Sequence, residues 1–171
     1  MKKIVLTGYM ASGKTTIGRL LSKASGLEYI DLDEFIERKE GIRISEIFEK
    51  KGEVYFRKKE HFALKEILSE DAGLVIALGG GTPCYANNHL LLQGEDIITI
   101  YLKASVHELA SRLGKQRHTR PLLSNVPESE IEEFIAKHLF DRSYYYNQAN
   151  HKVLVDGKTP EAIVNEIMSL F

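Results

Sequence analysis

The sequence predicts an α/β fold, in which a parallel sheet is covered by helices on both faces. Short apolar segments alternate with helical patterns along the whole chain, and the first of them runs directly into a glycine-rich loop, GYMASGKTTIG. The alternation continues without an internal repeat or a long linker. Because 171 residues, 43% of them hydrophobic, suit one domain with a substantial core, we expect a single domain over residues 1–171.

Five segments are predicted as strands because they are short, apolar and mostly rich in β-branched or aromatic residues: 3–7, 27–31, 74–78, 97–102 and 152–155. Helical periodicity marks residues 15–24, 53–68, 106–113, 128–145 and 160–170, the last with Pro160 suited to a first turn. Strands and helices that alternate in this way predict a parallel sheet. Ligands of such sheets bind at the carboxyl ends of the strands, so we expect the chemistry in the loops that follow them.

The loop after the first strand has the spacing of a phosphate-binding loop. Gly8, Gly13, Lys14 and Thr15 occupy the fixed positions of G-x-x-x-x-G-K-T, where backbone N–H groups point at an anion and the next helix presents its positive end. Lys14 would reach the β- and γ-phosphates, and Thr15 has a hydroxyl of the kind that binds Mg²⁺. The alternative, a plain glycine turn, is disfavoured by the strand before the loop and the helix after it.

Two carboxylates, Asp31 and Asp33, follow the second strand. One could hold Mg²⁺, directly or through water, and the other could accept a proton from an attacking hydroxyl. An N-cap for a helix that begins near Glu34 is the structural alternative. The phosphate loop nearby favours a functional role for at least one of them.

Arg57 lies on the predicted helix 53–68, with Glu60 and His61 on the same face. Residue types alone favour a solvated face with a weak ion pair, and a surface or packed role for His61. The glycine triplet at 79–81 follows the third strand. Three glycines destabilise regular structure, so we favour close approach of a ligand over a tight turn, and we interpret Cys84 as a small thiol without reactivity.

The segment 114–127 has no clear periodicity and carries several basic residues, as a flap over phosphates would. Arg120, held extended ahead of Pro121, is our first choice for an arginine that stabilises the transferred group, and Arg117 is the second. An ordinary exposed basic loop is the alternative. Arg142 stands near the end of a long helix, before a run of tyrosines that we interpret as packing, and its role is open from residue type alone.

The motifs GYMASGKTTIG, DLDEFIE, GEVYFRKKE, ALGGG, TRPLL and RSYYYNQA, in this order, resemble those of shikimate kinase over essentially the whole chain. The resemblance implies a small P-loop kinase fold with a five-stranded parallel sheet flanked by helices, a substrate-binding region and a mobile lid at about residues 113–125. It also implies the family reaction, in which the γ-phosphoryl group of ATP moves to the 3-hydroxyl of shikimate on the route to aromatic amino acids.

The resemblance also implies residue roles. Asp33 matches the carboxylate that binds and activates the acceptor hydroxyl, Arg57 and Arg142 match the pair that grips the shikimate carboxylate, and Arg120 matches the lid arginine on ATP. It thus reverses the solvated-face interpretation of Arg57. The remaining positions are implied to bind the substrate (Gly79, Gly80, Gly81), ATP (Ala11, Ser12, Gly13, Lys14, Thr15, Thr16, Arg112) and Mg²⁺ (Thr15, with Asp31 through water).

Composition limits the partners. A formal charge of −1 gives no general attraction to nucleic acid or to an anionic membrane, so small charged ligands, here shikimate and ATP, are expected. The single cysteine forms no intramolecular disulfide, and the N-terminal apolar run is too short for a signal or a membrane span, which predicts a cytoplasmic location. We also expect a monomer, although no motif in the sequence sets the oligomeric state. A kinase for gluconate or for a nucleoside monophosphate, and a nucleotide switch that acts through a protein partner, are the competing hypotheses.

Overall fold

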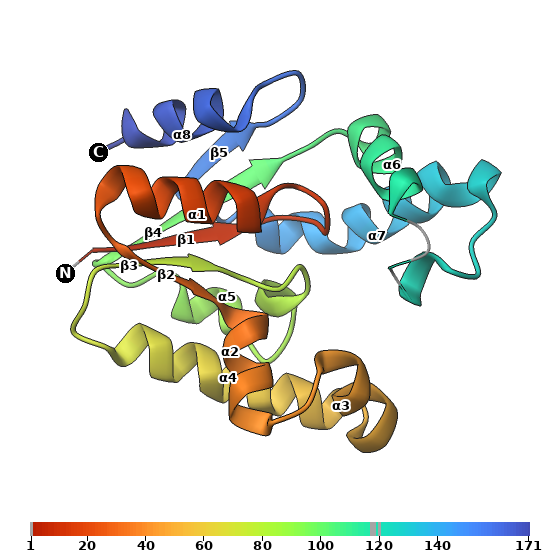
Figure 1. The fold of residues 1–171 in the computed structure, drawn as a ribbon, viewed down its shortest axis with the longest axis horizontal. Helices are drawn as coiled ribbons and strands as arrows, with labels where there is room; N and C mark the ends of the chain where they lie inside the picture. Colours follow the sequence, from red (N-terminus) through yellow and green to blue (C-terminus); the bar gives the residue numbers. More distant parts are fainter. Residues whose placement is uncertain (1, 117–118, 120) are drawn as a thin grey trace.

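A five-stranded parallel sheet forms the centre of the molecule in the computed structural model, which describes residues 2–116, 119 and 121–171 (Figure 1). The strands run in the order β2-β3-β1-β4-β5, so the strand before the phosphate loop lies in the middle. Every strand pair is parallel, and the predicted strands are confirmed with ends shifted by at most one residue. The strands are β1 (Lys3–Thr7), β2 (Glu28–Asp31), β3 (Leu74–Ala77), β4 (Ile97–Lys103) and β5 (His151–Leu154).

Helices cover both faces of the sheet, as predicted, with α1 and α8 on one side and α4 on the other (Figure 1). The alternation of side chains along β1 explains this arrangement, because Ile4 and Leu6 pack in one hydrophobic cluster and Val5 packs in the other. The helices are α1 (Lys14–Ser25), α2 (Leu32–Glu40), α3 (Ile44–Lys51), α4 (Glu53–Ser69), α5 (Asn88–Leu91), α6 (Val106–Lys115), α7 (Ile131–Tyr146) and α8 (Pro160–Met168).

The structure adds short helices that periodicity did not predict. α3 and α5 have eight and four residues, too few to show a convincing apolar stripe. The helix expected near Glu34 is α2, which begins at Leu32, and the last predicted helix ends at Met168. The long helix expected over 128–145 begins later, at Ile131, after a 3₁₀ turn.

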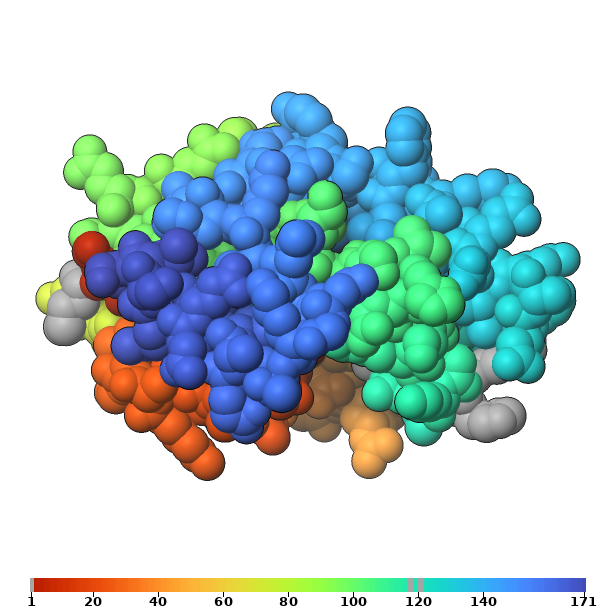
Figure 2. All heavy atoms as spheres, turned by 90° about the horizontal axis from the view of Figure 1, so that it is seen from above, coloured from red at the N-terminus to blue at the C-terminus, as the bar shows by residue number. Residues whose placement is uncertain are grey.

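Helix α6 and residues 121–130 project beyond the carboxyl ends of the strands, at one end of the molecule (Figures 1 and 2). Figure 2, which looks onto α8, shows α6 on the same face, with the residues that precede α8 between the two helices. The predicted lid falls in this part, where a 3₁₀ turn, η3 (Pro121–Leu123), is present. Arg117 and Arg120, our two choices for the lid arginine, lie outside the described residues. Over the described ranges, no helix is long and apolar enough to cross a membrane.

Candidate active site

The loop between β1 and α1 has the backbone of an anion cradle. Gly13, at the N-cap of α1, has a left-handed conformation with φ of 100°, which a side chain would strain. Ala11 has φ of 63° and tolerates the same region at some cost. Lys14 folds back over the loop, where its Nζ donates to the carbonyl oxygens of Gly8 at 2.8 Å and Tyr9 at 2.9 Å. The lysine is thus held above the N-terminus of α1.

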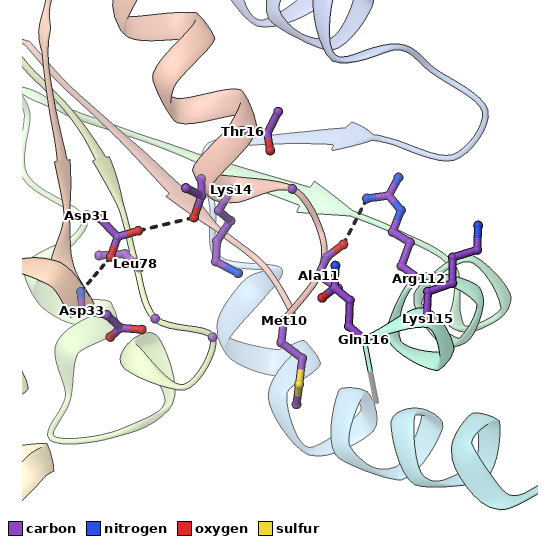
Figure 3. A pocket seen from close by; sticks show the side chains of 14 residues that line it. Met10, Ala11, Lys14, Thr16, Asp31, Asp33, Leu78, Arg112, Lys115 and Gln116 are labelled. Atoms are coloured by element: carbon purple, nitrogen blue, oxygen red, sulfur yellow. Dashed lines mark hydrogen bonds between the residues drawn. The ribbon is translucent and has the colours of Figure 1, made fainter. Parts of the chain in front are cut away.

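A cavity of about 470 Å³ opens in front of this loop. Lys14 points into it, Asp31 and Asp33 lie on one side, and Arg112 lies on the other (Figure 3). Arg112 comes from α6, donates to the carbonyl oxygen of Ala11 at 3.0 Å and pairs with Glu108 at 2.8 Å. The structure therefore brings together most of the residues predicted to bind the nucleotide. The cavity is lined by Ala11, Gly13, Lys14, Thr15, Thr16 and Arg112 among others.

Asp31 has the N-cap role that the sequence left open, and its second oxygen faces Thr15. Its Oδ1 caps α2 by accepting from the backbone N–H groups of Asp33 at 3.0 Å and Glu34 at 3.2 Å. Its Oδ2 accepts from the Thr15 hydroxyl at 3.4 Å and from the Tyr29 hydroxyl at 3.3 Å. The cap thus fixes a carboxylate oxygen beside Thr15, and this pair of oxygens suits a hard cation such as Mg²⁺.

Asp33 stands at the junction of the nucleotide cavity with a second cavity of about 280 Å³. Met10, Gly79 and Gly80 also line both cavities. Burial, together with the nearby carboxylates of Asp31 and Glu60, raises the pKa of Asp33 to about 6, against the opposing charge of Lys14. A carboxylate with this pKa is ionised near neutral pH and still accepts a proton readily.

We expect a pH dependence that follows Asp33. Turnover should fall as the pH decreases through about 6, because the protonated carboxyl group no longer accepts a proton. A profile of kcat/KM for the acceptor against pH, at saturating nucleotide, measures this limb. A rate that stays constant from pH about 7 to about 5 would exclude Asp33 as the titrating group.

Arg57 and Arg142 enter the second cavity from different helices, α4 and α7. The Arg57 side chain is 17% exposed, and its Nη1 lies 2.9 Å from Oε1 of Glu60, which is 1% exposed. Glu60 also accepts from the Thr82 hydroxyl at 2.7 Å. Glu60 is therefore buried and Arg57 half-buried, in contrast to the solvated face that residue types alone favoured. Two guanidinium groups in one cavity can bind a carboxylate through several N–H groups.

The glycine triplet packs against these functional side chains. A Cβ atom on Gly81 would lie 2.9 Å from Nη2 of Arg57, and one on Gly80 would lie 3.1 Å from Nη1 of Arg142. On Gly79 it would lie 3.1 Å from Oδ1 of Asp33. Each glycine leaves room for a different charged side chain, which explains why the segment needs three of them.

Comparisons with known proteins agree with this geometry. The shikimate kinase family model matches residues 10–171. A shikimate kinase of Flavobacterium johnsoniae is 54% identical over 170 residues, 99% of each chain. The chain belongs to the shikimate kinase family. Two solved structures support this membership and the fold. A shikimate kinase from Bacteroides thetaiotaomicron has a TM-score of 0.90 and 31% identity, over 99% of this chain and 97% of that chain. A shikimate kinase from Acinetobacter baumannii in complex with shikimate has a TM-score of 0.88 and 35% identity, over 99% of this chain and 92% of that chain.

Several contacts of this shikimate kinase family member were missed by sequence reasoning. Tyr9 is 1% exposed, and its hydroxyl lies 2.9 Å from Nδ1 of His138 on α7. Tyr146, the buried member of the tyrosine run, donates to the Gly80 carbonyl oxygen at 2.5 Å. These contacts join residues 66 or more positions apart, and no local spacing signals them. The pair of Glu60 with Arg57 was expected from their shared helical face, but the burial of Glu60 was not.

Proposed function

We propose that the protein transfers the γ-phosphoryl group of ATP to the 3-hydroxyl of shikimate, which gives shikimate 3-phosphate and ADP, and that it acts as a monomeric single domain. One observation carries the proposal beyond the family: Asp33 lies where the two cavities meet, between Lys14 and the two arginines. Family membership supports the acceptor. An acceptor with a carboxylate held by Arg57 and Arg142 would present a hydroxyl group to Asp33.

The nucleotide would bind in the larger cavity. The backbone N–H groups of residues 13–16 would hold the phosphates at the positive end of α1, and Lys14 would bridge the β- and γ-phosphates. Ser12, which the resemblance also implies at ATP, is 1% exposed, and its backbone N–H donates to the Tyr9 carbonyl oxygen at 3.1 Å, so it would support the loop from inside. Arg112 would lie near the base, and Arg120 from the lid would contact ATP, as the resemblance implies. Bound in this way, the γ-phosphate would point toward Asp33.

Mg²⁺ would be held by Thr15, with Asp31 acting directly or through water. When bound, the ion neutralises charge on the β- and γ-phosphates. In the part of the chain that the structure describes, no group of three or more His, Cys, Asp or Glu side chains could hold a metal ion. The remaining ligands would therefore be phosphate oxygens and water, as is usual for Mg²⁺ in kinases.

In the transfer step, the acceptor oxygen forms a bond to the γ-phosphorus while the bond from that phosphorus to the bridging oxygen of ADP breaks. The hydroxyl proton moves to Asp33, and ADP leaves with the bonding electron pair. Because the transition state is loose, most of the rate enhancement would come from alignment and from the charges of Lys14 and the lid arginine. A closed lid would also exclude water, a competing acceptor.

The deciding experiment measures ADP release with Mg²⁺ and ATP. We expect turnover with shikimate and none above background with gluconate, with nucleoside monophosphates or without an acceptor. Turnover with gluconate or a nucleoside monophosphate instead would support a kinase activity but exclude shikimate as its acceptor. ATP binding without any acceptor-dependent turnover would favour the nucleotide switch.

Arg142→Ala should raise the KM for shikimate by about 30-fold, because a charge-assisted hydrogen bond to the carboxylate is lost. The KM for ATP should stay unchanged, since the second cavity takes the acceptor. Steady-state kinetics with each substrate varied in turn measure both values. Lys137→Ala, on the exposed surface of the same helix, is the matched control. A loss of ATP affinity alone would contradict the assignment of Arg142.

A further inference from the structure

Tyr85 covers the guanidinium group of Arg57. The Cζ atom of Arg57 lies 3.8 Å from the centroid of the Tyr85 ring and 5.1 Å from that of Phe56. Arg57 also lines an outer pocket with Tyr85 and Phe62, in addition to the second cavity. Tyr85 is not among the residues that line the second cavity, which we propose to hold the acceptor and call the acceptor cavity. It therefore packs on Arg57 from outside that cavity.

The chain around Tyr85 is held in an unusual conformation. The two residues after it, Ala86 and Asn87, both have left-handed backbones, with φ of 51° and 54°. Such a conformation is costly for alanine and persists only where neighbouring contacts enforce it. This strained turn fixes the position of Tyr85 beside Arg57, which indicates that the position of the Tyr85 ring matters.

The enforcing contacts come from Asn88, which is fully buried. Its Nδ2 donates to the Thr82 carbonyl oxygen at 2.9 Å, and its backbone N–H donates to the Tyr85 carbonyl oxygen at 3.0 Å. Its Oδ1 lies 2.7 Å from Nδ1 of His61, one helical turn after Arg57 on α4. The turn that carries Tyr85 is thus tied to the helix that carries Arg57.

Stacking and ion pairing use different parts of a guanidinium group. A carboxylate accepts hydrogen bonds from the N–H groups at the edge of the guanidinium plane, as Glu60 does from Nη1. An aromatic ring packs on the face of that plane and leaves the other N–H groups at the edge available. A ring on the face therefore restrains Arg57 without competing for the donors that an acceptor carboxylate needs. Without it, Arg57 would keep its edge contacts with Glu60 at 2.9 Å and Glu53 at 3.5 Å but lose the contact on its face, and any orientational freedom so gained would be lost again when the acceptor binds, which lowers affinity.

We propose that Tyr85 is a positioning residue that holds the Arg57 guanidinium in its acceptor-binding orientation before shikimate arrives. The proposal rests on the carboxylate-binding role proposed for Arg57. Tyr85 touches neither substrate, and its effect is on acceptor affinity through Arg57. His61 and Asn88 support it by fixing the turn.

Tyr85→Leu tests this role by removing the ring. We expect the KM for shikimate to rise by about threefold to tenfold, with kcat and the KM for ATP nearly unchanged. Tyr85→Phe keeps the stacked ring and should restore the KM to within about twofold of the original. Phe62→Leu, which removes another aromatic side chain of the same outer pocket, is the matched control. Because Tyr85 is 38% exposed, the melting temperature of Tyr85→Leu should stay close to that of the unmodified enzyme. If Tyr85→Leu melts at a clearly lower temperature, Tyr85→Gln, which also removes the ring, is measured in its place.

A double-mutant cycle with Arg57→Ala shows whether Tyr85 acts through Arg57. In the Arg57→Ala background, Tyr85→Leu should leave the KM for shikimate unchanged. An equal rise in both backgrounds, or an unchanged KM in Tyr85→Leu alone, would overturn the role of Tyr85 while the proposed function stands. If the unmodified enzyme shows no shikimate-dependent turnover, the proposed function fails, and the role of Tyr85 fails with it.

Discussion

Replacing Lys14 by Met should lower kcat by about 100- to 1,000-fold, because the charge that gathers the β- and γ-phosphates is lost in the transition state. The fold should persist, since methionine keeps most of the apolar stem. The loop would lose the two hydrogen bonds from Nζ to the carbonyl oxygens of Gly8 and Tyr9. ADP release at saturating shikimate and ATP measures the effect, and circular dichroism checks the fold.

Lys23→Met is the control for the loss of a lysine from the same helix, because Lys23 is exposed in the last turn of α1. It should turn over at nearly the original rate. Turnover of Lys14→Met close to that of the unmodified enzyme would show that the loop does not hold the transferred phosphate. A Lys14→Met protein that is unfolded by circular dichroism would contradict the expectation that the fold persists.

Asp33→Asn should lower kcat by about 100-fold or more, because asparagine cannot accept the proton of the acceptor hydroxyl. The acid limb near pH 6 should disappear with the carboxylate. The KM for shikimate should change less than kcat, since the amide still hydrogen-bonds to the substrate. Glu34→Gln, one residue further along α2 and exposed, is the matched control. A rise in KM with kcat preserved would leave Asp33 as a binding group only.

The same substitution should stabilise the folded protein at pH about 8. The folded-state pKa of Asp33 is raised from its ordinary value of 3.8 to about 6, so its contribution to stability is present below pH 3.8 and is lost as the pH rises through about 6. Above that range the carboxylate stays ionised close to Asp31 and Glu60, at a cost. Thermal melts of both proteins measure the difference, and a lower melting temperature for Asp33→Asn would contradict it.

Local patterns were sufficient for the sheet and for the phosphate loop. The central strands β1, β3 and β4 are mostly apolar runs, the edge strands β2 and β5 are short segments with β-branched or aromatic residues, and the fixed spacing from Gly8 to Thr15 places the loop between β1 and α1. Those features depend on neighbours in the sequence, so periodicity and spacing report them directly. The short helices α3 and α5 lack that signal, and their packing against α4 determines them.

The environment of the arginines could not be predicted in the same way. Residue types favoured an exposed pair between Arg57 and Glu60, but Thr82, 22 positions further along, accompanies Glu60 in the interior. The role of Arg142 was ambiguous because its neighbours are distant in the sequence: Tyr9 lies in the loop after β1, and Gly80 lies in the loop after β3. The family resemblance supplied roles for both arginines. It left open how the fold restrains them, which depends on contacts between distant segments.

The tight packing of residues 79–81 also matters for inhibition. Every substitution of a glycine adds a Cβ atom, and at these positions that atom would push against Asp33, Arg142 or Arg57. A variant that escapes a compound by changing this segment would therefore shift the end of a side chain for which we propose a role in acceptor binding or transfer. A compound whose affinity comes from the backbone of the triplet would meet little viable resistance there.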